Sequence, residues 1–346
     1  MGMKMTFLSI LSFFIVINLV GCATEKKEVV NITWPLPPDP PRVRYVKSIA
    51  EAREVLPPRS FFKKAVSFLF GEAESPRLMH PYGLFIGNPE KIFVTDTELQ
   101  VVHLFDFSNK TYRQIFKVPG GGLRSPIGVV MDSEGNVYIS DSELGRIFQY
   151  NAAGIFSKTW SIQFTRPTGI SINFKRMILY VVDTAEHHIV ALNLKGEKLF
   201  EFGKRGAGEG EFNFPTHIAV SPVNGDVYVA DSMNFRIEQF SPEGKFIKQI
   251  GSSGSRIGSF SKLKGISVDL RGIIYAVDGL YDTVQMFNSK GEFLMNFGKA
   301  GSKEGEFWLP AGIAVDQDLI YVADSYNKRI QLFQLIDASQ PNGASK

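Results

Sequence analysis

Short apolar segments recur at regular intervals along most of the chain. From Leu78 onward, each of six similar units begins with a run such as PYGLFI, PIGVVM or PTGISI. A second run follows that ends in aspartate, such as IFVTD or VYISD, and then a third run, a tight turn and a fourth. The first two runs are apolar at consecutive positions, which is typical of strands covered on both faces. The pattern therefore predicts repeated four-stranded units.

The spacing of these units predicts how they assemble. The aspartates that end the second strands lie 42 to 48 residues apart, at Asp96, Asp141, Asp183, Asp231, Asp278 and Asp324. One such sheet cannot cover both of its apolar faces, but six sheets placed radially around an axis cover one another. We therefore expect an all-β protein with a six-bladed β-propeller over residues 78–336.

Two segments that join one unit to the next carry a family resemblance. The runs GKRGAGEGEFNFPTHIAV and GKAGSKEGEFWLPAGIAV resemble the NHL repeat, and the resemblance extends over residues 78–336. It implies the NHL-type six-bladed propeller. It leaves the function open, because one fold can carry many activities.

The sixth unit has only three strands before it ends near Ile336. The segment 42–49, RVRYVKSI, matches the fourth-strand pattern, so we expect it to complete the last blade and close the ring. Within residues 42–77, the run RSFFKKAVSFLFG places apolar residues four apart and predicts a short amphipathic helix at about 59–70. This helix would pack on the propeller, contact a membrane surface or dock a partner.

Residues 1–21 have the pattern of an export signal. A single charge, Lys4, precedes an apolar run of 16 residues, which is too short for a stable membrane span. The run ends in LVGC, which resembles the lipobox of bacterial lipoproteins and implies cleavage before Cys22 and lipidation of that residue. Ala23 then implies sorting to the outer membrane, with the protein facing the periplasm. An uncleaved anchor helix is the alternative.

The segments beside the blades are expected to be simple. Residues 22–41 are rich in proline and predict an extended tether, and residues 337–346 predict a disordered tail. The whole chain has 346 residues, of which 44% are hydrophobic, so a buried core is expected. Its net charge of +3 gives no strong basic field for nucleic acid. The single cysteine excludes an intramolecular disulfide and any multi-cysteine metal centre.

Function in a propeller is expected in the central channel or on the face where the loops from strand two to three and from strand four to one meet. The repeated aspartates there predict turn caps, with a cation-binding crown as the alternative. Arg146, Arg236 and Arg329 follow them in alternate blades. These arginines would form a threefold set for an acidic partner, or pair with aspartates of the same or the adjacent blade.

Aromatic residues at loop positions are the other candidates for partner binding. They are Phe235, Tyr281, Trp308 and Tyr326, and packing between blades is the alternative for each. Resemblance to NHL-repeat lyases that mature amidated peptides implies zinc-binding histidines just after the strand-one proline, but those positions hold other residues here. His217 and His80 are weak metal candidates, since a catalytic zinc needs three protein ligands. We predict no catalytic residue and no cofactor.

These observations favour a noncatalytic protein-binding platform in the bacterial envelope. Its expected partners are the membrane, through lipid on Cys22, and an envelope protein of unknown identity, whereas nucleic acid is not expected. The alternative is a metal-dependent propeller enzyme, similar to lyases or lactonases, with its site in the central channel.

Overall fold

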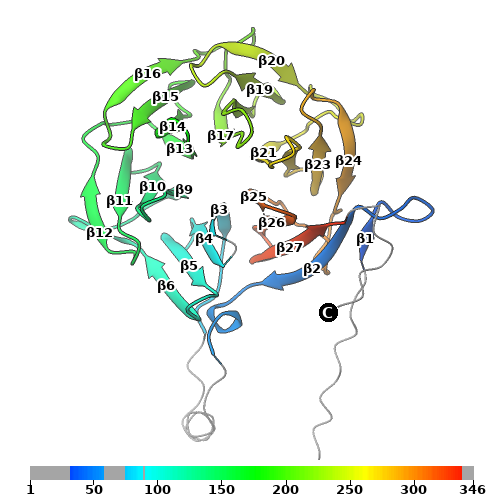
Figure 1. The fold of residues 1–346 in the computed structure, drawn as a ribbon, viewed down its shortest axis with the longest axis horizontal. Coiled ribbons are helices and arrows are strands. Elements are labelled where there is room, and N and C mark those ends of the chain that lie inside the picture. The colour runs from blue at the N-terminus through cyan, green and yellow to red at the C-terminus, as the bar shows by residue number, and fades with distance from the viewer. Residues whose placement is uncertain (1–31, 58–74, 89, 337–346) are drawn as a thin grey trace, which may run out of the picture. The chain divides into compact units, whose positions relative to one another are not determined.

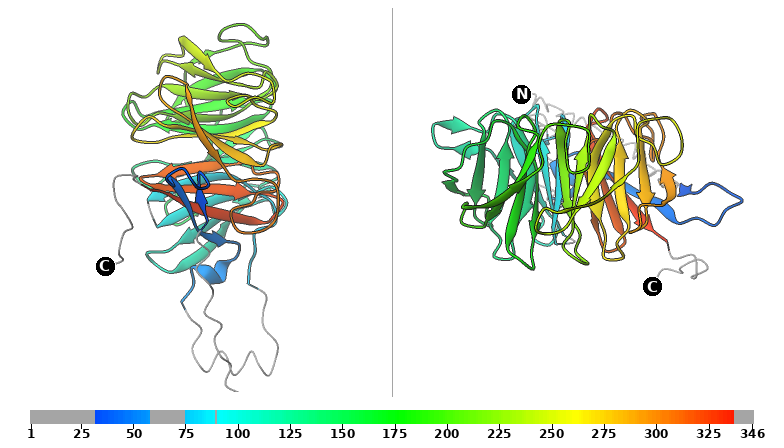
Figure 2. Two further views of the ribbon diagram at one scale, coloured as in Figure 1. Left: turned by 90° about the vertical axis from the view of Figure 1, so that its right-hand side faces the viewer. Right: turned by 90° about the horizontal axis from the view of Figure 1, so that it is seen from above.

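The computed structural model describes residues 32–57, 75–88 and 90–336, which form six β-sheets arranged radially around a central channel (Figure 1). This confirms the predicted all-β, six-bladed propeller. The predicted signal peptide with Cys22, the helix at 59–70 and the tail at 337–346 lie outside the described residues. Figure 2 shows the same ring from the side, with the sheets standing next to one another.

Each of the first five blades is an antiparallel sheet of four strands that follow one another in sequence. Blade one comprises β3 (Pro81–Asn88), β4 (Lys91–Asp96), β5 (Val101–Asp106) and β6 (Thr111–Ile115). Blade two comprises β9 (Pro126–Met131), β10 (Val137–Asp141), β11 (Arg146–Tyr150) and β12 (Phe156–Thr159). Blade three comprises β13 (Pro167–Asn173), β14 (Ile178–Asp183), β15 (His188–Asn193) and β16 (Lys198–Phe202).

The next two blades repeat this order. Blade four comprises β17 (Pro215–Val220), β18 (Val227–Asp231), β19 (Arg236–Phe240) and β20 (Phe246–Ile250). Blade five comprises β21 (Leu263–Val268), β22 (Ile274–Asp278), β23 (Thr283–Phe287) and β24 (Phe293–Phe297). Two small elements lie outside the blades: a ribbon of β7 (Lys117–Val118) with β8 (Gly121–Gly122), and the 3-10 helix η1 (Ala52–Glu54).

The sixth blade is built from both ends of the described chain. Its strands are β25 (Ile313–Asp316), β26 (Leu319–Asp324) and β27 (Arg329–Leu335), with β2 (Val43–Ile49) paired antiparallel to β27. The side chains of Val43 and Ile49 at the two ends of β2 are fully buried, because they pack into the clusters on either side of this blade. The predicted closing strand is therefore confirmed.

The proline-rich segment differs from the extended tether that the sequence predicts. From Ile32 onward it lies against the last blade, where β1 (Thr33–Trp34) adds a fifth strand beside β2. The Trp34 ring lies 5.9 Å from that of Phe297 and 5.7 Å from that of Phe333. Burial of a large aromatic side chain supplies the free energy that holds this segment on the propeller.

The hydrophobic core lies between neighbouring blades. Six clusters fill the six interfaces, and the second strand of each blade is buried at nearly every position. This confirms that consecutive apolar residues mark strands covered on both faces. Within the residues described, no helix is both long and apolar enough to cross a bilayer.

Candidate functional site

The repeated aspartates hold the loops of one face in place. Asp96 accepts backbone hydrogen bonds from Met79 at 2.7 Å and Leu99 at 3.0 Å, and Asp141 accepts equivalent bonds in blade two. Although burial acts to raise it, hydrogen bonds from His103 and the backbone lower the pKa of Asp96 to about 2. These contacts are those of turn caps, as the sequence predicts.

The three arginines are engaged in contacts within the chain. Arg236 is buried and donates to Asp231 at 2.9 Å and to carbonyl oxygens of the linker that enters its blade. Arg329 makes the same contact with Asp324 at 2.8 Å. Arg146 donates to the carbonyl oxygens of Ser161 and Ile162 rather than to an aspartate. These contacts favour a structural role, and partner binding by the arginines stays a prediction.

Three rings form an exposed aromatic patch where blades six and one meet. The Trp308 and Tyr326 rings lie 5.5 Å apart, and the His80 ring lies 5.3 Å from that of Tyr326. Trp308 is 53% exposed and Tyr326 49% exposed. We call His80, Trp308 and Tyr326 the Trp308 patch. Its backbone is fixed, because the amide of Trp308 donates to Asp324 at 2.8 Å.

The other two aromatic candidates make no ring contact with the Trp308 patch among the described residues. Tyr281 is 44% exposed, and its hydroxyl reaches the carbonyl oxygen of Gly254 at 3.4 Å. Phe235 is only partly exposed and packs against the cluster between blades four and five. Tyr281 is therefore available to a partner, whereas Phe235 contributes to packing between blades.

The structure does not bring the two histidine candidates together. His80 Nδ1 lies 2.9 Å from Thr97 Oγ1 in the loops, whereas His217 lies in the channel. The Nε2 atom of His217 is buried and has no hydrogen-bond partner. Burial, with a smaller contribution from Lys264, lowers the pKa of His217 to about 3, so its ring is neutral. The described residues contain no group of three His, Cys, Asp or Glu side chains that could hold a metal ion.

Around His217 the channel is lined by residues of all six blades. The other five blades carry glycine at the position that His217 occupies in blade four. These residues and their neighbours line a small space of about 60 Å³. A side chain on Gly83 or Gly312 would overlap the backbone of the neighbouring blade, which explains why glycine recurs there. Tyr82 stacks on His217 with ring centroids 5.4 Å apart, and Lys264 Nζ lies 5.3 Å above the Tyr82 ring.

Sequence reasoning missed this pairing of Tyr82 with Lys264. The sequence does contain a signal for it. Among the six residues that follow the strand-one proline or its equivalent, Tyr82 is the one aromatic residue and Lys264 the one charged residue. The resemblance to zinc-binding lyases concerns histidine alone at that position. A comparison of residue types around the ring would have identified both.

Comparison with known proteins identifies the repeat. The NHL repeat model matches residues 212–240 and 307–333. The chain is 30% identical to the protein brain tumor of Drosophila melanogaster over 111 residues, which cover 32% of this chain and 10% of that protein. It is 38% identical to the peptidyl-glycine alpha-amidating monooxygenase of Mus musculus over 121 residues. This match covers 32% of this chain and 12% of that protein. The matches thus span about a tenth of these relatives.

Solved structures share the fold. A Bacteroides thetaiotaomicron protein of unknown function has a TM-score of 0.61 at 17% identity, over 76% of this chain and 71% of that one. An auxiliary nutrient binding protein of the same organism has a TM-score of 0.59 at 13% identity, over 75% of this chain and 70% of that one. Virginiamycin B lyase of Staphylococcus aureus has a TM-score of 0.55 at 15% identity, over 75% of this chain and 96% of that one. The chain therefore contains NHL repeats and folds as a six-bladed β-propeller.

Proposed function

We propose that this NHL-repeat propeller is a noncatalytic platform that binds a partner protein through the Trp308 patch. The exposed contact between Trp308 and Tyr326 carries the proposal. Large rigid aromatic side chains contribute most of the binding free energy at many protein interfaces, because they bury much apolar area and lose little conformational freedom. The backbone at Trp308 is held by its hydrogen bond to Asp324, so little backbone ordering is needed when a partner arrives.

The polar groups around the patch support binding rather than chemistry. The aspartates cap turns and the arginines hold linkers, so both recurrent ionisable groups of this face have structural contacts. In the channel, His217 supplies one nitrogen, and the equivalent positions of the other blades are glycine. These residues do not fit a catalytic zinc site, which takes three protein ligands. Related folds include a nutrient binding protein and a lyase, so the fold itself is compatible with either role.

We further propose that the protein is held at the bacterial envelope by lipid on Cys22 and faces the periplasm. The apolar run before LVGC, the single cysteine and the polar residues after it support this location. Lipidation at one end and an aromatic patch on the propeller would together hold the partner near the membrane.

A crosslinking experiment on the full-length protein tests both proposals. We expect an envelope protein to crosslink to the wild type in the membrane fraction. Replacing Trp308→Ala together with Tyr326→Ala should reduce its recovery at least 10-fold, because each truncation at a binding hot spot costs about 2 kcal/mol or more. The control is Ile155→Ser, which changes an exposed apolar residue outside the patch.

The outcomes separate the alternatives. Cys22→Ser should move the protein out of the membrane fraction, and retention there would contradict the lipid anchor. Equal recovery of the partner by the patch variant and the wild type would contradict the Trp308 patch. Stoichiometric zinc or calcium that survives dialysis of the mature protein would instead support a metal-dependent propeller enzyme.

A further inference from the structure

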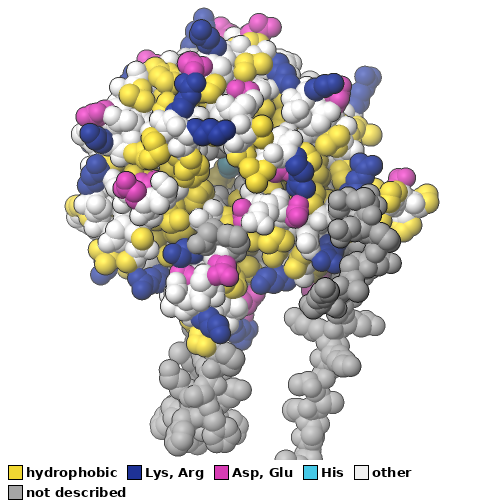
Figure 3. Space-filling view, in the orientation of Figure 1, with side chains coloured by type: hydrophobic (Ala, Val, Ile, Leu, Met, Phe, Trp, Pro, Cys, Tyr) yellow, Lys and Arg dark blue, Asp and Glu magenta, His cyan; other side chains and the backbone are white. Residues whose placement is uncertain are grey.

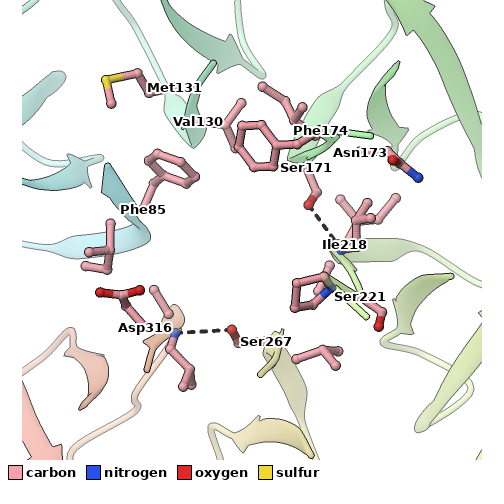
Figure 4. Close-up of a pocket in the computed structure, with 18 of the residues that line it drawn as sticks. Phe85, Val130, Met131, Ser171, Asn173, Phe174, Ile218, Ser221, Ser267 and Asp316 are labelled. Atoms are coloured by element: carbon pink, nitrogen blue, oxygen red, sulfur yellow. Dashed lines mark hydrogen bonds between the residues drawn. The ribbon is translucent and has the colours of Figure 1, made fainter. Parts of the chain in front are cut away.

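A cavity of about 530 Å³ opens at the other end of the channel from the Trp308 patch. It is lined by the ends of the six innermost strands and by the turns that follow them (Figure 4). The patch lies on loops at the other ends of the strands. Its volume falls in the range that holds small molecules. Figure 3 shows hydrophobic side chains gathered around the central hollow of the ring.

The walls of this cavity differ from blade to blade. The second residue after the glycine position is large and apolar in blades one and two but small or hydroxyl-bearing in the others: Phe85, Val130, Ser171, Ala219, Ser267 and Ala314. Met131 and Phe174 lie beside Val130, and Ser267 and Asp316 lie across the cavity from them (Figure 4). The cavity thus has an apolar wall facing a polar one.

Asp316 on the polar wall has an unused acceptor. Its Oδ2 atom is buried and has no hydrogen-bond partner in the described structure, and burial raises the pKa of this carboxyl. The other two lining carboxylates are satisfied. Asp132 accepts from the Tyr138 hydroxyl at 2.8 Å, and Asp269 accepts from the Tyr275 hydroxyl at 3.0 Å and pairs with Arg271. Asp316 is partly exposed, and neither of its oxygens has a hydrogen-bond or ion-pair partner among the described residues, so it is the lining carboxylate that a donor in the cavity would stabilise.

Charge and hydroxyl groups indicate the chemistry of that donor. Three carboxylates line the cavity, and Arg271 neutralises one of them, Asp269. The lining cation Lys175 donates to the carbonyl oxygen of Val223 at 2.9 Å. Asp316 is left without an ion pair among the described residues, which favours a positively charged ligand beside it. Ser267 Oγ accepts the Val315 amide at 3.2 Å and keeps its own proton for a second bond.

We propose that this cavity binds a small aromatic alkylamine. Its ring would lie against Phe85, Val130 and Phe174, and its ammonium group would pair with Asp316. An oxygen on the same molecule would accept the Ser267 hydroxyl proton. This site is separate from the Trp308 patch, and the inference does not depend on protein binding there.

Three probes of one shape test this on the purified full-length protein by isothermal titration calorimetry at pH 7.5. They are 1-naphthylmethylamine, neutral 1-naphthalenemethanol and anionic 1-naphthoate. We expect one saturable amine site, with at least 10-fold weaker binding of the alcohol and the anion. Asp316→Asn should reduce amine affinity to that of the alcohol. Phe174→Ala, at a half-exposed residue, should weaken the amine and the alcohol together.

The matched control is Asp318→Asn, because Asp318 is an exposed carboxylate in the same turn, outside the cavity. It should leave amine binding unchanged. Equal affinity for amine and alcohol, an unaltered amine affinity in Asp316→Asn, or the lack of saturable binding by the amine would each overturn the proposal. The comparison of probes on the wild type needs no variant to fold.

Discussion

One position in the third strand carries glutamate in blade four and glutamine in blade six. Glu238 is fully buried, accepts the Gly210 amide at 3.2 Å and lies 3.1 Å from Arg236, while its second oxygen has no partner. Gln331 accepts the Gly305 amide at 2.9 Å and donates to Asp324 at 3.0 Å. The oxygen and the nitrogen of the Gln331 side-chain amide both have hydrogen-bond partners, whereas one oxygen of the Glu238 carboxylate has none.

Burial raises the pKa of Glu238 to about 7, against the attraction of Arg236. The folded state therefore holds a proton that the unfolded state releases near pH 4.5, and this contribution to stability is lost as the pH rises through about 7. Glu238→Gln should remove that loss. We expect Glu238→Gln to be more stable relative to wild type at pH 8 than at pH 5. The difference in free energy of unfolding between the variant and wild type should increase by up to about 3 kcal/mol between these two pH values, measured by urea denaturation.

The reverse change in blade six is the control for this effect. Gln331→Glu should destabilise the protein more at pH 8 than at pH 5, because it places a carboxylate beside Asp324. If the difference between wild type and Glu238→Gln does not vary with pH, Glu238 does not retain a proton in the folded protein.

The linkers between blades show how a short repeated element is fixed. Gly203, Gly251 and Gly298 each have a positive φ, and nine residues later a buried phenylalanine packs against each of them. Parallel bridges such as Arg205 with Phe212 hold the turn between them. Glycine is required twice here, once for its backbone conformation and once for the space that the ring occupies.

Gly203→Ala separates these two requirements when compared with Gly120→Ala. Both glycines have φ near +85°, but a Cβ on Gly203 would overlap the Phe212 ring, whereas Gly120 has open space. We expect Gly203→Ala to cost about 2–4 kcal/mol and Gly120→Ala about 1–2 kcal/mol in thermal or urea unfolding. Equal costs would show that the Phe212 ring moves aside freely.

At the scale of the whole molecule, closure of the ring depends on β2. Val43 and Val46 lie on this strand, but Val43 is buried in the cluster with Phe333 while Val46 is 42% exposed. Val43→Asp should destabilise the protein by about 4 kcal/mol or more, because it buries an unpaired charge. Val46→Asp, the same change on the solvent side, should cost about 1 kcal/mol or less.

Light scattering provides a second measurement on these variants. Release of β2 would leave β27 as an open strand edge, and such edges pair with other chains. Aggregation is therefore expected for Val43→Asp and not for Val46→Asp. Similar stability and solubility of the two variants would argue against closure by β2.

The repeated parts of this fold could be predicted from sequence, and the parts that break the repeat could not. Consecutive apolar residues identified the strands, and the missing fourth strand of the last unit identified β2. In contrast, β1 has only two residues beside prolines, so it has no periodicity, and Trp34 is held by tertiary packing. The contact of Tyr82 with Lys264 depends on how blades one and five, which flank blade six, face each other at the channel, and no single repeat contains that information.

Pairing of β2 with β27 also sets the order of events during synthesis. The ribosome makes β2 first among the main strands of the ring and β27 last. No arrangement of the intervening blades can complete the molecule before residues near 335 have emerged. A nascent chain must therefore keep one edge of its earliest long strand, the edge that pairs with β27, open until the end of translation, and products of premature termination cannot form the closed ring.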